Sequence, residues 1–398
     1  MAAAGIIADG FGAALEGLGR LQAHPARLIN DFVAVVGIGG TLVNAALVGA
    51  VGLAAVALSG VAHSGPTFAA VLTMTGFGLF GKTPLNVLPI ILGVYLAARI
   101  AGKGLKDYLI IALFGTALGP LVSALAVEIG LDGLLAVLVG TAGGIITGMV
   151  LPAVAVSMLH LHQGYNLYNM GLSCGFFGLF AAGLFRAFGH AWEAQAAWFT
   201  GSSLLLTLVA PVLSLLLLAA GVAAGGRSSF GRFVAIQKLP GRLPSDFVDM
   251  TTLGGALVNA GLVGIAGSAY VLAVGAPFNG PVLGGLFTII GFAAFGTHLR
   301  NSWPVVAGVV IACLVTGNPL NAPGPILAAI FCTTLAPLAG QFGILVGLAA
   351  GFMHLVMVLT TGSWHGAMNL YNNGFAGGLT AALIIAVIQW IRSNQSEK

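Results

Sequence analysis

The sequence predicts an all-α, polytopic membrane protein with about 10–12 transmembrane segments in two homologous halves that include short or re-entrant helices. Two observations carry this prediction: a composition suited to lipid, and a motif that recurs about half a chain away. Of the 398 residues, 58% are hydrophobic and only 6% are charged. A soluble domain carries about 25% charged residues. The surface of this chain therefore faces a bilayer.

Apolar runs follow one another along the chain, and a crossing helix needs roughly 20 apolar residues. In the first half we expect segments at 33–61, 66–81, 84–102, 108–130, 134–159 and 165–185. In the second half we expect segments at 248–276, 280–296, 302–317, 324–338, 341–361 and 366–391, with a joining segment at 194–224. Those at 66–81, 280–296 and 324–338 are short, which predicts half-helices or re-entrant loops. Such backbone needs burial in protein or a wet cavity.

The two halves share long matched blocks. DFVAVVGIGGTLVNAALVGAVG from Asp31 matches DFVDMTTLGGALVNAGLVGIAG from Asp246, an offset of 246 − 31 = 215. GPTFAAVLTMTGFGLFG from Gly65 matches GPVLGGLFTIIGFAAFG from Gly280 at the same offset. The predicted organisation is an N-terminal surface segment (1–30), a first membrane repeat (31–190), a linking helix and basic loop (191–245), a second repeat (246–392) and a tail (393–398).

A polar cassette occurs once in each half. Residues 162–171 read HQGYNLYNMG and residues 365–374 read HGAMNLYNNG. On a helix, the histidine and two asparagines of each cassette would share one face. Polar groups inside a membrane are costly unless they pair or serve a wet site. The predicted solute-binding residues are His162, Asn166, Tyr168, Asn169, His365, Asn369, Tyr371 and Asn372, with Asn44 and Asn259 of GG(T/A)LVNA as a second matched pair.

An alternative for these amides is structural, because asparagines can bond across helices and hold the two halves together. Two aspartates, Asp31 and Asp246, precede the first helix of each half, where we expect them to act as caps. The ends of the short segments carry Lys82 in GKTPLN, and His298 and Arg300 in GTHLRN. These cations would draw an anion or a carbonyl-bearing solute, or would snorkel to the interface.

Other function classes find less support in the sequence. The cysteines Cys174, Cys313 and Cys332 lie in apolar runs without CxxC spacing, and no HExxH motif is present. We therefore expect no enzyme activity, no catalytic residue, no bound metal and no cofactor. The open alternatives are an intramembrane metal-dependent enzyme that uses the histidines and a non-transporting membrane scaffold. Coupling to protons or sodium stays open, because histidine titrates near neutral pH.

The HxxxNLYNxG cassettes and the DFV…GG(T/A)LVNA blocks resemble an uncharacterised bacterial multi-pass membrane family, known only as a domain of unknown function. The resemblance covers Asp31 to about Arg392 and implies no activity. The two-half architecture with short helices is also loosely similar to urea-transporter-like channels. The sequence thus predicts a multi-pass channel or transporter of the bacterial inner (plasma) membrane. Its expected partners are the lipid bilayer and a small polar solute between the halves. Nucleic acid is not expected, and a homo-oligomer is left open.

Overall fold

The structure is a computed structural model that describes residues 1–190 and 196–396 of the chain. Residues 191–195 of the predicted linking segment and 397–398 of the predicted tail lie outside this description. Within the described ranges the regular elements are helices, with one isolated β-bridge between Asn30 and Ala197. The predicted all-α fold class is confirmed.

The first half begins with the helices α1 and α2, which are followed by the long helix α3, the short helix α4 and the helix α5. Next comes a helix that is interrupted by a 3₁₀ turn, and then α8 and α9. The bounds are α1 Ala2–Asp9, α2 Phe11–Gln22, α3 Phe32–Ser59, α4 Gly65–Phe77, α5 Pro84–Ile100, α6 Leu105–Gly115, η1 Thr116–Leu118, α7 Gly119–Val127, α8 Gly133–His162 and α9 Asn169–Ala187.

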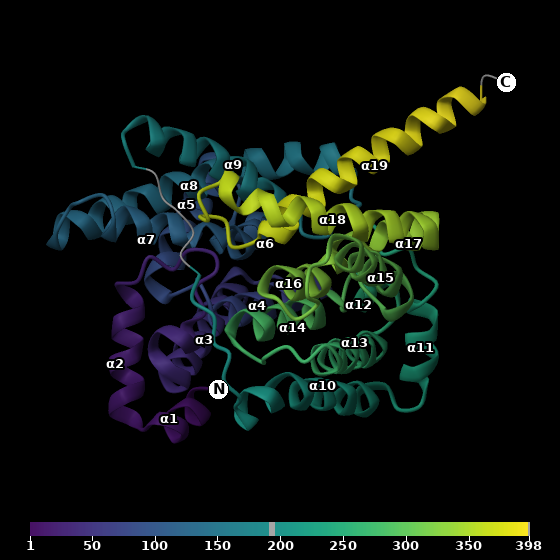
Figure 1. Cartoon of the computed structure of the whole chain (residues 1–398), viewed down its shortest axis with the longest axis horizontal. Helices are drawn as coiled ribbons and strands as arrows, with labels where there is room; N and C mark the ends of the chain where they lie inside the picture. The colour runs from purple at the N-terminus through teal and green to yellow at the C-terminus, as the bar shows by residue number, and fades with distance from the viewer. Residues whose placement is uncertain (191–195, 397–398) are drawn as a thin grey trace.

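The second half repeats this order, including the short helix and the interrupted helix. Its bounds are α10 Leu204–Gly225, α11 Ser228–Ile236, α12 Phe247–Met250, α13 Leu253–Ala273, α14 Gly280–Phe292, α15 Leu299–Thr316, α16 Pro323–Phe331, η2 Cys332–Leu335, α17 Ala336–Phe342, α18 Ile344–Trp364 and α19 Asn372–Ser396. The matched helices α2 and α11 lie at opposite edges of the molecule (Figure 1). Matched hydrogen bonds also join Gln22 to Asn44 and Gln237 to Asn259.

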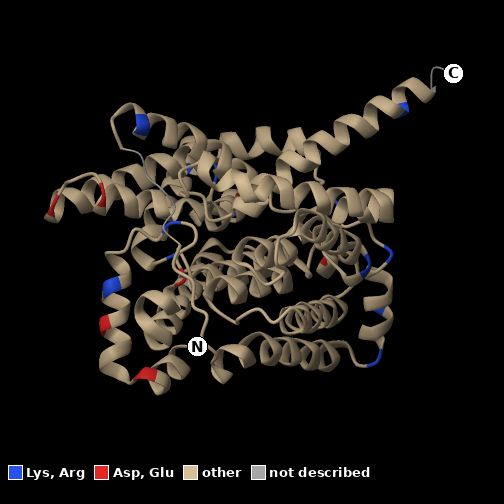
Figure 2. Cartoon of the chain, viewed as in Figure 1, with Lys and Arg blue, Asp and Glu red and all other residues tan. Residues whose placement is uncertain are grey.

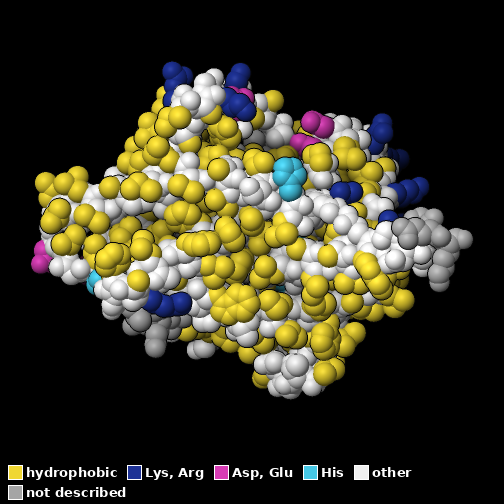
Figure 3. Space-filling model, turned by 90° about the horizontal axis from the view of Figure 1, so that it is seen from above, with side chains coloured by type: hydrophobic (Ala, Val, Ile, Leu, Met, Phe, Trp, Pro, Cys, Tyr) yellow, Lys and Arg dark blue, Asp and Glu magenta, His cyan; other side chains and the backbone are white. Residues whose placement is uncertain are grey.

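In the described ranges, ten helical segments are long and apolar enough to cross a membrane. Large apolar side chains lie exposed along them, as on α8 and α10. Charged residues are few and lie mostly at the margins of the molecule (Figure 2). The face seen from above is largely hydrophobic (Figure 3). This surface suits lipid contact, and the chain is a multi-pass membrane protein.

The short helices α4 and α14 pack against each other at the centre of the molecule (Figure 1). A methyl group added at Gly76 would lie 2.9 Å from the carbonyl oxygen of Gly284, and one added at Gly291 would lie 2.8 Å from Cα of Ala69. Residue numbers therefore run in opposite directions along the two helices, which are antiparallel. Glycine at these positions allows the two backbones to approach this closely.

Two carboxylates, a buried one at Asp31 and a half-buried one at Asp246, cap helices in both halves at once. Asp31 accepts hydrogen bonds from N–H of Val33 in its own half and from N–H of Gly280 at the start of α14. Asp246 accepts from N–H of Val248 and from N–H of Gly65 at the start of α4. A carboxylate suits the free N–H groups and the positive dipole end of a helix. The predicted capping role is confirmed, and it extends across the interface between the halves.

Candidate functional site

The two polar cassettes lie in breaks between helices and not on a helical face as the sequence spacing suggested. Helix α8 ends at His162 and α9 begins at Asn169, while α18 ends at Trp364 and α19 begins at Asn372. The helix cannot continue because two successive residues take left-handed φ values. They are Gln163 and Gly164 in the first cassette, and Gly366 and Ala367 in the second.

Each cassette histidine closes the break by two hydrogen bonds. Nδ1 of His162 accepts from N–H of Asn166 at 3.2 Å, and Nε2 lies 2.9 Å from Oδ1 of Asn169. Nδ2 of Asn169 in turn donates to the carbonyl of Ala155. Because Nδ1 accepts a backbone N–H while Nε2 faces a carbonyl oxygen, the two partners require a neutral ring with its hydrogen on Nε2.

The second cassette repeats this arrangement. Nδ1 of His365 accepts from N–H of Asn369 at 3.3 Å, and Nε2 lies 3.0 Å from Oδ1 of Asn372. Nδ2 of Asn372 donates to the carbonyl of Val358. Both ring nitrogens are therefore occupied in each half, Nδ1 by the backbone turn and Nε2 by an asparagine side chain.

The middle asparagine of each cassette bridges the two halves. Nδ2 of Asn166 donates to the carbonyl of Gly374, and Nδ2 of Asn369 donates to the carbonyl of Gly171, both at 3.1 Å. The amide oxygens accept from N–H of Tyr168 and Tyr371, respectively. These amides thus fix the backbone on which the two tyrosines are carried.

Asn44 and Asn259 hold the turns that follow the two short helices. Nδ2 of Asn44 donates to the carbonyls of Gly78 and Lys82 at 2.7 and 2.8 Å. Nδ2 of Asn259 donates to the carbonyls of Ala293 and Thr297 at 2.8 and 2.9 Å. An unpaired backbone carbonyl at this depth would be costly, so each amide stabilises an otherwise exposed helix end.

A cavity of about 420 Å³ lies between the halves, beside the two cassettes and the short helices. Matched residues from both halves line it: Thr73 and Thr288, Phe77 and Phe292, Phe114 and Phe331, Leu167 and Leu370, Tyr168 and Tyr371, and Gly171 and Gly374. Asn169, Met170 and Asn373 also contribute. The volume falls in the range of small-molecule sites, about 300–1,000 Å³. We call this space the central cavity.

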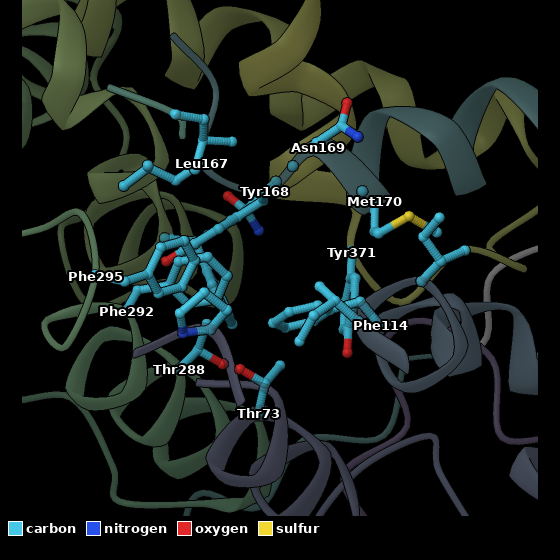
Figure 4. Close-up of a pocket in the computed structure, with 18 of the residues that line it drawn as sticks. Thr73, Phe114, Leu167, Tyr168, Asn169, Met170, Thr288, Phe292, Phe295 and Tyr371 are labelled. Atoms are coloured by element: carbon cyan, nitrogen blue, oxygen red, sulfur yellow. The ribbon is translucent and has the colours of Figure 1, made fainter. Parts of the chain in front are cut away.

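The two tyrosines form opposite walls of the central cavity, and the two threonines lie near each other at its lower end in Figure 4. The Tyr168 ring packs edge-on against Phe292, with 4.4 Å between ring centroids. The Tyr371 ring packs edge-on against Phe77 at 4.6 Å. Each tyrosine thus contacts the short helix of the opposite half. The hydroxyl of Thr73 is buried and has no hydrogen-bond partner among the described residues.

The halves differ at one position in the turn after each short helix, which is Lys82 after α4 and Thr297 after α14. Lys82 is fully buried, and its Nζ donates to the hydroxyls of Thr116 and Tyr371 at 2.7 and 2.5 Å. The matched position in the second half, Thr297, carries no charge, and its hydroxyl has no partner among the described residues. The hydroxyl of Tyr168 lies 3.3 Å from Oγ1 of Thr333. Lys82 is therefore not a snorkelling interfacial cation.

The second predicted cation group has a different outcome. His298 is buried and caps α15, because Nδ1 accepts from N–H of Asn301 and Nε2 lies 2.9 Å from the carbonyl oxygen of Leu239. Arg300 is exposed, and its backbone N–H donates to Gln237. Of the two basic side chains with an ammonium or guanidinium group in these matched turns, Lys82 is buried and Arg300 is exposed.

Three of the ten residues predicted from sequence line the central cavity: Tyr168, Asn169 and Tyr371. The others are buried nearby and bond to backbone groups: His162, Asn166, His365, Asn369, Asn372, Asn44 and Asn259. The sequence analysis did not single out Thr73 and Thr288, or the phenylalanines Phe77 and Phe292 four residues further on. Their signal was present, because TMTGF and TIIGF align at the 215-residue offset.

The titratable and sulfur-bearing groups do not gather into a metal centre in the described part of the chain. No three histidine, cysteine, aspartate or glutamate side chains come close enough together there to hold a metal ion. Cys174, Cys313 and Cys332 are buried and unbridged.

Comparison with known proteins gives one family. A family model described as a protein of unknown function (DUF1576) matches residues 12–187 and 226–390. No curated protein and no solved structure matches the chain. The looser likeness to urea-transporter-like channels therefore finds no support.

Proposed function

Because the chain belongs to the DUF1576 family, whose description names no function, we propose a function from the geometry of the site: a membrane channel or transporter for a small solute that passes between the two halves. The observation that carries the proposal is the central cavity. It is built from matched residues of both halves, at the place where two antiparallel short helices meet two interrupted helices.

Non-helical backbone at membrane depth is tolerated where protein buries it or where it lines a cavity. Both conditions hold for the NLYN segments, since Asn166 and Asn369 are buried while Tyr168, Asn169 and Tyr371 face the cavity. Binding sites between structural repeats, formed by broken helices, are a common arrangement in transporters. This analogy concerns architecture and supports the proposal without naming a solute.

The cassette residues divide into two proposed roles. Tyr168, Asn169 and Tyr371 contact the solute. The histidines and the remaining cassette asparagines position those three residues through the backbone bonds described above, and Asn44 and Asn259 do the same for the ends of α4 and α14. A passive pathway in the bacterial inner membrane is the simplest form of the proposal, and coupling to an ion is compatible with it.

The test is solute flux into proteoliposomes that contain the full chain, followed by stopped-flow light scattering. The panel spans urea, small amides, polyols, amino acids and organic anions. Thr73→Phe places a ring in the central cavity, and we expect it to abolish the flux of any solute that the unmodified protein carries. Ser157→Phe adds the same ring on an exposed position of α8 and should leave that flux unchanged.

Two results would count against the proposal. One is the absence of flux above empty liposomes for every solute in the panel, with protein that unfolds cooperatively. The other is equal flux in Thr73→Phe and the unmodified protein, which would place the pathway elsewhere.

A further inference from the structure

Two of the rings that line the central cavity contact a buried lysine, Lys82, that has no carboxylate partner in the described part of the chain. The Lys82 ammonium has no ion pair with a carboxylate in the described part of the chain. Its two hydrogen-bond partners are hydroxyls, so one of its three N–H donors has no partner there. A charge withdrawn from water is stable only when it is paired or well bonded. The site is therefore electrostatically incomplete as it stands.

The missing partner has room in the central cavity, which is lined by two aromatic rings that contact Lys82. Nζ of Lys82 lies 5.5 Å from the centroid of the Phe77 ring and 4.7 Å from that of the Tyr371 ring. Both rings line the central cavity. In such an apolar surrounding the attraction between the ammonium and a negative charge in the cavity is weakly screened. When its amine is protonated, Lys82 thus favours an anion in this space.

Two hydroxyl groups can bond that anion directly. Thr73 lines the central cavity and is 2% exposed. Its hydroxyl has no hydrogen-bond partner among the described residues. The Tyr371 hydroxyl accepts from Lys82, so its own hydrogen is left for a second acceptor. Hydrogen bonds to an ionised acceptor are shorter and stronger than neutral ones.

The remaining lining selects against a small hydrated ion. The cavity walls are mostly aromatic and aliphatic, and no Asp, Glu, Lys or Arg lines it among the described residues. An apolar body fits such walls, while a strongly hydrated inorganic anion would lose its water without replacement. One neighbouring cation balances one negative charge.

From these observations we propose that the solute of the central cavity is a small organic monoanion. It has one oxyanion group, bonded by Thr73 and Tyr371 under the charge of Lys82, on an apolar body held between the Tyr168 and Tyr371 walls. This inference rests on the proposed function of the same cavity and gives it a substrate class.

The test compares the binding of matched aromatic probes to the purified full chain by equilibrium dialysis. Benzenesulfonate carries a permanent negative charge, benzenesulfonamide is its neutral counterpart, and benzyltrimethylammonium carries the opposite charge. We expect benzenesulfonate to bind at least roughly tenfold more tightly than either of the others, which corresponds to about 1.4 kcal/mol. Lys82→Met should remove the preference and Lys82→Arg should retain it.

Thr297→Met is the matched control, since it makes the equivalent change after α14 and should keep the preference. Equal binding of the three probes to the unmodified protein would overturn the anion assignment, and this comparison does not depend on any variant folding. Flux of neutral solutes in the proteoliposome panel would then leave the transport proposal standing. A preference retained in folded Lys82→Met would remove Lys82 as its source.

Discussion

The first half places Lys82 after its short helix, and the second half places Thr297 at the matched position, although the surrounding backbone is held in the same way. Asn44 and Asn259 bond to the same pair of carbonyls in each half. The duplicated residues thus maintain the backbone, whereas the residue that differs changes the charge beside the cavity. Residues that recur in both halves need not be the ones that contact a solute.

The largest effect on stability is expected from the hydrogen bonds by which Asn166 and Asn369 join the two halves. Asn166→Ala or Asn369→Ala removes an amide that bonds to a glycine carbonyl of the other half and to a tyrosine N–H. An unsatisfied buried group costs about 1–3 kcal/mol, so we expect each variant to lower the free energy of unfolding by at least about 2 kcal/mol. Denaturant unfolding of the purified protein in detergent measures the loss.

The two variants should differ in a defined direction. Oδ1 of Asn166 also accepts a hydrogen bond from the Thr334 hydroxyl, and the first half has Ala117 at the equivalent place. Asn166→Ala therefore breaks three hydrogen bonds and Asn369→Ala breaks two. Although the N–H of Tyr168 keeps Oγ1 of Thr334 as a second acceptor, we expect Asn166→Ala to be the more damaging of the two. Asn394→Ala removes an exposed asparagine of α19 that bonds only locally to Trp390 and serves as the control. A near-neutral Asn166→Ala would mean that the bridge does not hold the halves together.

The hydroxyls of Tyr168 and Tyr371 allow the two halves to be compared by removing one oxygen atom from each. Tyr371→Phe removes an acceptor from the charged Lys82, and hydrogen bonds to charged groups contribute about 1.5–3 kcal/mol. Tyr168→Phe removes a longer bond between neutral hydroxyls, for which about 0.5–1.5 kcal/mol is expected. Unfolding of both variants in the unmodified and Lys82→Met backgrounds measures the coupling. Equal losses for the two tyrosines, with no coupling to Lys82, would contradict the asymmetry.

The sequence predicted the helices, the two halves and the short central elements, because apolar run length and a repeated block of 17 residues from Gly65 and Gly280 are local signals. It also located the cassettes near the centre. It misplaced their side chains, since the spacing of His162, Asn166 and Asn169 suits a helix. The left-handed turn at Gln163 and Gly164 is needed to see that they clamp a break.

The central cavity could not be predicted in the same way. It depends on which elements of one half meet which elements of the other, as when the Tyr371 ring meets Phe77, almost three hundred residues earlier in the chain. The burial of Lys82 is likewise a tertiary property. A single lysine beside a glycine in sequence is equally compatible with an interfacial cation, and only the packing of Thr116 and Tyr371 around Nζ separates the two.

The capping aspartates give the smallest expected difference. Asp31 uses both carboxylate oxygens as acceptors, since Oδ1 accepts from Val33 and Gly280 while Oδ2 accepts from N–H of Phe199. Asn at this position would turn an NH₂ group toward a backbone N–H. Asp246 binds N–H of Gly65 with both oxygens at 3.1 Å and N–H of Val248 with Oδ1, so one oxygen suffices.

We therefore expect Asp31→Asn to lower the free energy of unfolding by about 1–2 kcal/mol, and Asp246→Asn by less than about 1 kcal/mol, within the range for helix caps. Thermal unfolding of the two variants side by side checks this order. If the losses were equal, a single retained oxygen would be enough at both caps. The bond between Oδ2 of Asp31 and N–H of Phe199, beside the start of α3, would then contribute nothing to stability. The reverse order would show that the cap on α4 matters more than the cap on α14, and would shift the asymmetry of the molecule from Lys82 to the short helices themselves.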